Sequence, residues 1–140
     1  MSYQLKTTYK KILADTITPV SVYLKIRDKF PNSLLLESSD YHANNNSFSY
    51  ICCNPIAAIK IENEQITRTF PDGKTTVTAI DEQTDIPMVI SNFSKEFITE
   101  DLDFKFINNG LFGYIAYDAV RYFESVKISK KENSQHIFLF

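Results

Sequence analysis

The sequence has few of the residues that mark several common classes of protein. It contains no tryptophan, three glycines and two cysteines among its 140 residues. Cys52 and Cys53 are neighbours, and adjacent cysteines rarely close a disulfide without strain. Two thiolates are too few ligands for a zinc site, and His42 and His136 lie far from them in the sequence. We therefore predict no disulfide, no metal site in this chain and a reducing, cytoplasmic compartment.

Neither charge nor hydropathy indicates a nucleic acid or membrane partner. The formal net charge is −2 and basic and acidic residues are mixed, so we expect no basic face for nucleic acid. The first residues lack the apolar core of a signal peptide, and no apolar run approaches the length that crosses a bilayer. The 11 Phe and 8 Tyr argue against disorder, and the length fits one soluble domain.

Apolar periodicity predicts both strands and helices. A helix should begin after an N-cap at Thr18, with Pro19 in its first turn, and end at Pro31; a second should begin near Asp85. Strands are expected over residues 5–13, 33–38, 47–53, 57–62, 65–70, 74–80, 104–107, 110–117 and 136–140, turns at 40–46 and 71–73, and short helical turns at 118–125. Helices are too few to alternate with the strands, which predicts an α+β fold with a largely antiparallel sheet and a few flanking helices.

Motifs of common catalytic sites are also missing. The sequence contains no GxxxxGK[ST], no GxGxxG after a strand, no HExxH and no GxSxG. His42 lies in an asparagine-rich loop and His136 opens a predicted strand, and a histidine in either place is more often a surface residue than a base. We predict no catalytic residue in this chain.

Two stretches stand out by their chemistry. In GLFGYIAYDAVRYFE, residues 110–124, the charged residues Asp118, Arg121 and Glu124 follow one another at helical spacing. They could form a structural ion network, or Arg121 could bind substrate; without a nearby nucleophile or base, residue chemistry favours the network. In SLLLESSD, residues 33–40, three leucines run into a carboxylate, which is either a solvated turn or the polar end of an apolar pocket.

These stretches carry a resemblance to a known family. LADTITPVSVYLKIRDKFPNSLLLES resembles the amino-terminal segment of anthranilate synthase component I, in which a T-P-V-x-x-Y-x-K helix precedes an L-L-E-S strand. GLFGYIAYDAVRYFE resembles that family's later G-x-x-G-Y-x-x-Y-D-x-x-R-x-x-E segment. The two motifs stand in the family's order and span nearly the whole chain.

The resemblance implies that residues 1–140 are the amino-terminal regulatory and scaffold domain of component I, an incomplete part of the fold shared with aminodeoxychorismate synthase. The full enzyme converts chorismate, with ammonia from glutamine, to anthranilate and pyruvate in tryptophan biosynthesis. It uses Mg²⁺ and a glutamine amidotransferase subunit, component II, and binds chorismate in a catalytic domain absent from this sequence. We therefore expect the chain alone to be inactive and without a cofactor. We also expect self-association, because HIFLF, residues 136–140, should lack a neighbouring strand.

The resemblance also implies that Leu36, Glu37 and Ser38 belong to a site where tryptophan binds and inhibits. A carboxylate can accept from the ligand's ammonium group, a hydroxyl can hydrogen-bond, and leucine can line the slot for the indole. Many members carry an R-x-S-F-I-G run after this strand; here Ser47 replaces the Arg and Cys52 the Gly, which leaves Lys60 as a weak candidate for a basic group facing the ligand.

Two alternatives stay open. Component I of aminodeoxychorismate synthase, in the folate pathway, commonly has Asp at the position of Glu37, so the LLES sequence favours anthranilate synthase. A free-standing, non-catalytic amino-acid-binding module is the other alternative.

Overall fold

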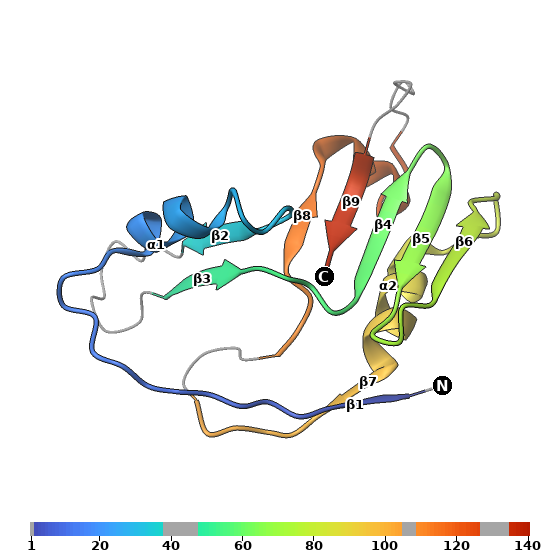
Figure 1. The fold of residues 1–140 in the computed structure, drawn as a ribbon. Coiled ribbons are helices and arrows are strands. Elements are labelled where there is room, and N and C mark those ends of the chain that lie inside the picture. The colour runs from blue at the N-terminus through green and yellow to red at the C-terminus, as the bar shows by residue number, and fades with distance from the viewer. Residues whose placement is uncertain (1, 38–47, 105–108, 127–134) are drawn as a thin grey trace. The chain divides into compact units, whose positions relative to one another are not determined.

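The structure is a computed structural model that describes residues 2–37, 48–104, 109–126 and 135–140. The described residues form two compact units, drawn in Figure 1. The sheet unit comprises residues 2–7, 56–103, 109–126 and 135–140, and the hairpin unit comprises residues 8–37, 48–55 and Phe104. The assignment of residues 1–140 to one regulatory and scaffold domain stays a prediction.

The two units contain different elements. The hairpin unit holds α1 (Pro19–Ile26), β2 (Leu34–Glu37) and β3 (Ser49–Cys52). The sheet unit holds β1 (Tyr3–Leu5), β4 (Ala58–Glu62), β5 (Gln65–Thr69), β6 (Thr75–Ala79), α2 (Ile86–Lys95), β7 (Phe97–Thr99), β8 (Gly113–Ile115), the 3₁₀-helix η1 (Tyr117–Tyr122) and β9 (Gln135–Leu139).

A five-stranded antiparallel sheet forms the body of the sheet unit. Its strand order is β6-β5-β4-β9-β8, as Figure 1 shows. This confirms the predicted α+β class with a largely antiparallel sheet and few helices. The expectation that HIFLF lacks a neighbouring strand is wrong, because Leu139 of β9 pairs with Ile59 of β4 on one side and Gly113 of β8 on the other. The edges of this sheet are β6 and β8.

The core lies where α2 packs against one face of this sheet (Figure 1). Alternate residues of a strand share a face, so the isoleucines of neighbouring strands meet there. α2 begins at an N-cap, Asp85, whose Oδ1 accepts from the Met88 N–H at 2.8 Å. The largest fully buried side chains of the core are Ile59, Ile61, Ile66, Ile86, Phe93 and Ile137.

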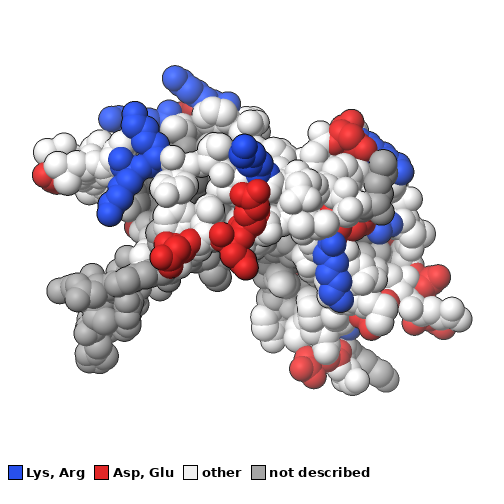
Figure 2. Space-filling view, turned by 90° about the horizontal axis from the view of Figure 1, so that it is seen from below, with Lys and Arg blue, Asp and Glu red and all other residues white. Residues whose placement is uncertain are grey.

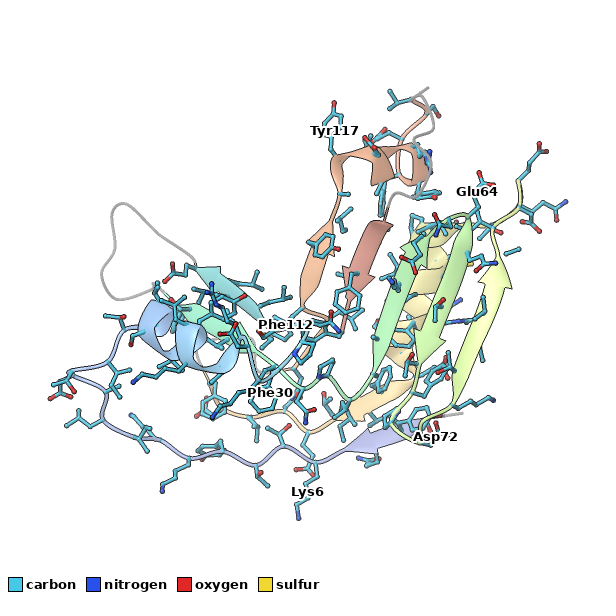
Figure 3. The ribbon with its side chains drawn as sticks, turned by 45° about the horizontal axis from the view of Figure 1, so that its top comes forward. Lys6, Phe30, Glu64, Asp72, Phe112 and Tyr117 are labelled. Carbon is cyan, nitrogen blue, oxygen red and sulfur yellow. The ribbon has the colours of Figure 1, made fainter. Side chains whose placement is uncertain are left out.

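The turn between β5 and β6 was predicted from its PDG sequence and is confirmed. The Phe70 N–H donates to the Lys74 carbonyl at 2.9 Å, and Gly73 has a φ of +81°, which glycine adopts at little cost. Asp72, labelled in Figure 3, closes the turn, because its Oδ1 accepts from the Lys74 N–H at 2.9 Å. Its Oδ2 accepts from the Tyr3 hydroxyl at 3.0 Å, which ties the turn to β1.

Three expectations need correction or cannot be compared with the structure. The strand expected over residues 5–13 is wrong, because β1 ends at Leu5 and the polar, lysine-rich segment beyond it is mostly exposed. β1 pairs in parallel with β7, with Tyr3 opposite Phe97. Phe104 lies in no strand, and the rest of the strand expected over 104–107 and the turn expected over 40–46 fall outside the described residues.

Candidate ligand site on the β2–β3 hairpin

α1 and its N-terminal cap prepare the approach to β2. Thr18 and Ser21 form a reciprocal capping box: each side-chain oxygen accepts from the other residue's N–H at 3.2 Å, and Pro19 occupies the first turn. The Tyr23 hydroxyl then donates to the Ser33 carbonyl at 3.3 Å, just before β2 begins. The TPVSVY sequence therefore both starts the helix and connects it to the strand that carries the predicted site.

β2 and β3 pair in antiparallel register, which decides which side chains share a face. The cross-strand pairs are Leu34 with Cys52, Leu35 with Ile51, Leu36 with Tyr50, and Glu37 with Ser49. Successive side chains of a strand point to opposite faces, and residues directly opposite one another point to the same face. One face therefore carries the Leu35–Ile51 and Glu37–Ser49 pairs, and the other carries the Leu34–Cys52 and Leu36–Tyr50 pairs.

Glu37 is exposed at the end of β2, which removes the cost that burial of its charge would carry. The Ser49 hydroxyl donates to Glu37 Oε1 at 3.4 Å. A carboxylate has about four lone-pair positions, so the group can accept further hydrogen bonds from a ligand. The geometry thus offers an accessible anionic acceptor with one protein donor beside it.

The structure separates residues that the sequence prediction grouped together. Leu36 is half-buried and points to the face opposite Glu37, whereas the half-buried Leu35 and Ile51 share the face of Glu37. Ser38 and Ser47 fall outside the described residues, so the assignment of Leu36, Glu37 and Ser38 to a tryptophan site stays a prediction.

Ser49 is the residue that sequence reasoning missed. The signal was present, because the alternation of SFSYICC places Phe48, Tyr50 and Cys52 on one face and leaves Ser49 on the other. What the alternation alone could not supply was the register that sets Ser49 opposite Glu37.

The remaining candidate groups are the two cysteines and Lys60. Cys52 and Cys53 are free, and burial, followed by the charge of Cys53, raises the pKa of the Cys52 thiol. Within the described ranges, no three His, Cys, Asp or Glu residues cluster in a way that could hold a metal ion. Lys60 lies in the sheet unit and pairs with Glu62 at 2.6 Å.

Figure 2 shows acidic and basic side chains interspersed on the face that it draws. Among the described residues, no helix combines the length and the apolar character needed to cross a membrane.

The second predicted constellation lies on and beyond η1. In a 3₁₀-helix residues three apart eclipse one another, which brings Asp118 and Arg121 to one side. Both are half-buried, and Glu124, which follows the helix, is exposed. The Arg121 guanidinium donates to the Tyr122 hydroxyl at 3.3 Å and lies 5.1 Å from the centre of that ring. The ion network of Asp118, Arg121 and Glu124 stays a prediction.

The glycine that opens β8 has a clear structural role. A Cβ atom built on Gly113 would lie 1.9 Å from the Phe138 carbonyl oxygen and 2.8 Å from Leu139 Cα. Only a residue without a side chain allows β8 and β9 to approach this closely. Tyr117 follows at the start of η1 and is 86% exposed; Figure 3 shows its side chain pointing away from the sheet.

Comparisons with known proteins agree with the motifs. No model of a known protein family matches the chain, and no solved structure matches it. Over 127 residues it is 32% identical to anthranilate synthase component 1 of Lactococcus lactis subsp. lactis, covering 89% of this chain and 25% of that protein. The protein of the same name from Aquifex aeolicus is 29% identical over 127 residues, covering 90% of this chain and 25% of that protein.

A third relative gives the same result. Anthranilate synthase component 1 of Pseudomonas putida is 32% identical over 114 residues, which cover 80% of this chain and 22% of that protein. The chain thus spans about a quarter of the length of the curated relatives that it matches. The chain is therefore related to anthranilate synthase component 1, and the resemblance that its two motifs predicted is confirmed.

Proposed function

We propose that this chain is part of a component I of anthranilate synthase, which converts chorismate, with ammonia from glutamine, to anthranilate and pyruvate. The observation that carries the proposal is the match over 127 residues, 32% identical, to a protein named anthranilate synthase component 1. The proposal includes a glutamine amidotransferase subunit as the partner that supplies ammonia, and a cytoplasmic location.

The chemistry of the reaction belongs to parts of the enzyme other than this chain. We assign no catalytic residue to residues 1–140. No step of the proposal uses Mg²⁺ bound by residues 1–140. Chorismate and Mg²⁺ would bind in the remaining three-quarters of the length that the relatives have.

The contribution we propose for this chain is regulatory. Tryptophan, the end product of the pathway, would bind at the end of β2 with Glu37 as acceptor for its ammonium group, and with Leu36 and Ser38 as further site residues. The support is that Glu37 is exposed and already receives one hydrogen bond, from Ser49, that fixes one carboxylate oxygen. An amino acid needs such an acceptor, and charge-assisted hydrogen bonds are the stronger ones.

The proposal is tested with the full-length protein, supplied with chorismate, ammonium and Mg²⁺. Anthranilate, detected by its fluorescence, should form and should decrease as tryptophan is added. Replacing Ser38 by Phe should weaken inhibition by about ten- to a hundredfold, since it removes a hydrogen bond and fills the slot. Aminodeoxychorismate as the product would instead favour the folate-pathway enzyme, and no turnover of chorismate would favour a non-catalytic binding module.

A further inference from the structure

We propose that Ser49 positions the Glu37 carboxylate for the ammonium group of a bound amino acid, and that this ligand lies on the hairpin face carrying Leu35 and Ile51. The inference rests on the proposed function, because it assumes that an amino acid binds at the end of β2. It adds a positioning residue and a choice between two faces, which the resemblance did not supply.

A hydrogen bond joins Ser49 to Glu37 across the hairpin. Ser49 stands directly opposite Glu37 in the β2–β3 ladder, and its hydroxyl donates to Oε1 at 3.4 Å. A glutamate side chain on a surface has several rotatable bonds, and ordering it costs free energy when a ligand binds. A donor that holds one oxygen reduces that cost and leaves the other oxygen for the ligand. Both residues are exposed, so a ligand can reach them.

The spacing between Leu35 and Glu37 along β2 suits an aromatic amino acid. Leu35 lies two residues before Glu37 on the same face, about 6.7 Å along the strand. In an aromatic amino acid the side-chain ring lies at a comparable distance from the ammonium group. The Leu35–Ile51 pair is half-buried and one same-face step along the ladder from the Glu37–Ser49 pair. The spacing of the two pairs therefore matches the spacing between the ring and the ammonium group of such a ligand.

The hairpin face that carries Leu36 and Tyr50 is less suitable for the ligand. Leu36 and Tyr50 form the next pair of the ladder, and alternation directs both away from the side of Glu37. A ligand lying over Leu36 would have to reach around the strand to contact the carboxylate. The inference therefore replaces Leu36, which the proposed function names as a site residue, with Leu35 as the residue beside the ring.

The test measures tryptophan inhibition of anthranilate formation by the full-length protein, relative to each variant's own uninhibited rate. Ser49→Ala should weaken inhibition by about twofold, as expected for the loss of one long, exposed hydrogen bond. Ser49→Thr keeps the hydroxyl and should restore most of the affinity. Because Ser49 is proposed to act through Glu37, Ser49→Ala should have no further effect in a Glu37→Gln background.

The face is tested with a matched pair of neighbouring substitutions. Leu35→Val and Leu36→Val each remove one methylene from a half-buried leucine of β2, so their melting temperatures should fall by similar amounts. Leu35→Val should weaken inhibition by about fourfold, the value of one methylene removed from a binding surface. A larger effect of Leu36→Val would place the ligand on the opposite face and overturn the inference.

The outcomes separate this inference from the proposed function. If the unmodified protein makes anthranilate but tryptophan does not inhibit it, the regulatory part of the proposed function fails and the inference falls with it. If tryptophan inhibits and Glu37→Gln weakens inhibition while Ser49→Ala does not, the proposed function stands and the role of Ser49 is wrong. A Ser49→Ala effect that persists in full in the Glu37→Gln background also refutes positioning through Glu37.

Discussion

Replacing Gly113 by alanine should break the pairing of β8 with β9. A methyl group at this position would lie 1.9 Å from the Phe138 carbonyl oxygen, and the atoms it meets next are Leu139 Cα and the Phe138 carbonyl carbon, both at 2.8 Å. All three belong to the backbone, so no side chain can rotate to make room. The two strands must move apart, and the pairs that join residues 113–115 to 137–139 would be lost with them.

The cost follows from two terms. Overpacking by a methyl group that cannot be accommodated costs about 1–3 kcal/mol. Each backbone hydrogen bond lost from the ladder costs about 0.5–1.5 kcal/mol more, even where water replaces the partner. A total of at least about 3 kcal/mol is a large share of the 5–15 kcal/mol that stabilises a typical domain. At about 2–4 °C per kcal/mol for a chain of this size, the melting temperature should fall by roughly 6–12 °C.

The measurement is thermal unfolding followed by far-ultraviolet circular dichroism, with Gly73→Ala as the matched control. Gly73 has a φ of +81° and nothing within 4 Å of an added Cβ, so alanine there brings backbone strain alone, about 1–2 kcal/mol. Gly113→Ala should therefore cost more than Gly73→Ala. If the two variants melt together, or if Gly113→Ala melts at the higher temperature, the close approach of β8 and β9 is refuted.

Two further predictions concern charged side chains. Arg121→Ala should destabilise the chain by about 1–2 kcal/mol, because it removes the hydrogen bond and the cation–π contact with Tyr122; urea unfolding that matches the unmodified chain would contradict this. The Lys74 N–H, the largest influence, and the Tyr3 hydroxyl lower the pKa of Asp72. A carboxyl group with a lowered pKa stabilises the fold above about pH 4, and this stability is lost as the pH falls further. Asp72→Asn should therefore be less stable than the unmodified chain near pH 6 and approach its stability near pH 2. A stability difference that stays constant from pH 6 to pH 2 would contradict this role of Asp72.

Local signals predicted several elements correctly. Thr18 followed by Pro19 gave the start of α1, Asp85 gave the start of α2, and the PDG sequence gave the turn between β5 and β6. Each of these depends on hydrogen bonds between residues only a few positions apart, so the sequence contains both partners within one short window. The strand expected over residues 33–38 corresponds to β2, Leu34–Glu37.

The errors arose where the partner lies far away in the chain. Tyr3 of β1 pairs with Phe97 of β7, and no local pattern shows that this pairing stops at Leu5. The interior place of β9 was missed for the same reason, because both of its partners, β4 and β8, precede it and nothing in HIFLF indicates which strands it joins. Strand pairing of this kind is decided by contacts between distant segments, which hydrophobic alternation does not specify.

The candidate site shows a different kind of limit. Leu36 and Glu37 were grouped because they are neighbours in a motif, but neighbours in a strand point to opposite faces, and only the register of β2 with β3 shows which other residues join each face. The motif therefore suggests Leu36 as the apolar neighbour of Glu37, whereas the register places Leu35 and Ile51 on the same face as Glu37.

The two motifs that carry the resemblance differ in what they can reveal by substitution. Glycine is required at position 113 because the backbones of β8 and β9 approach closely there. A substitution at this position therefore changes the stability of the fold, and any effect on function would follow from that change. Glu37 and Ser49 are exposed and share one long hydrogen bond, so their substitution should change stability by a few tenths of a kcal/mol at most. Weaker tryptophan inhibition in a Ser49 variant with an unchanged melting temperature would therefore report on ligand binding and not on folding, which makes this hairpin the better place to test the function.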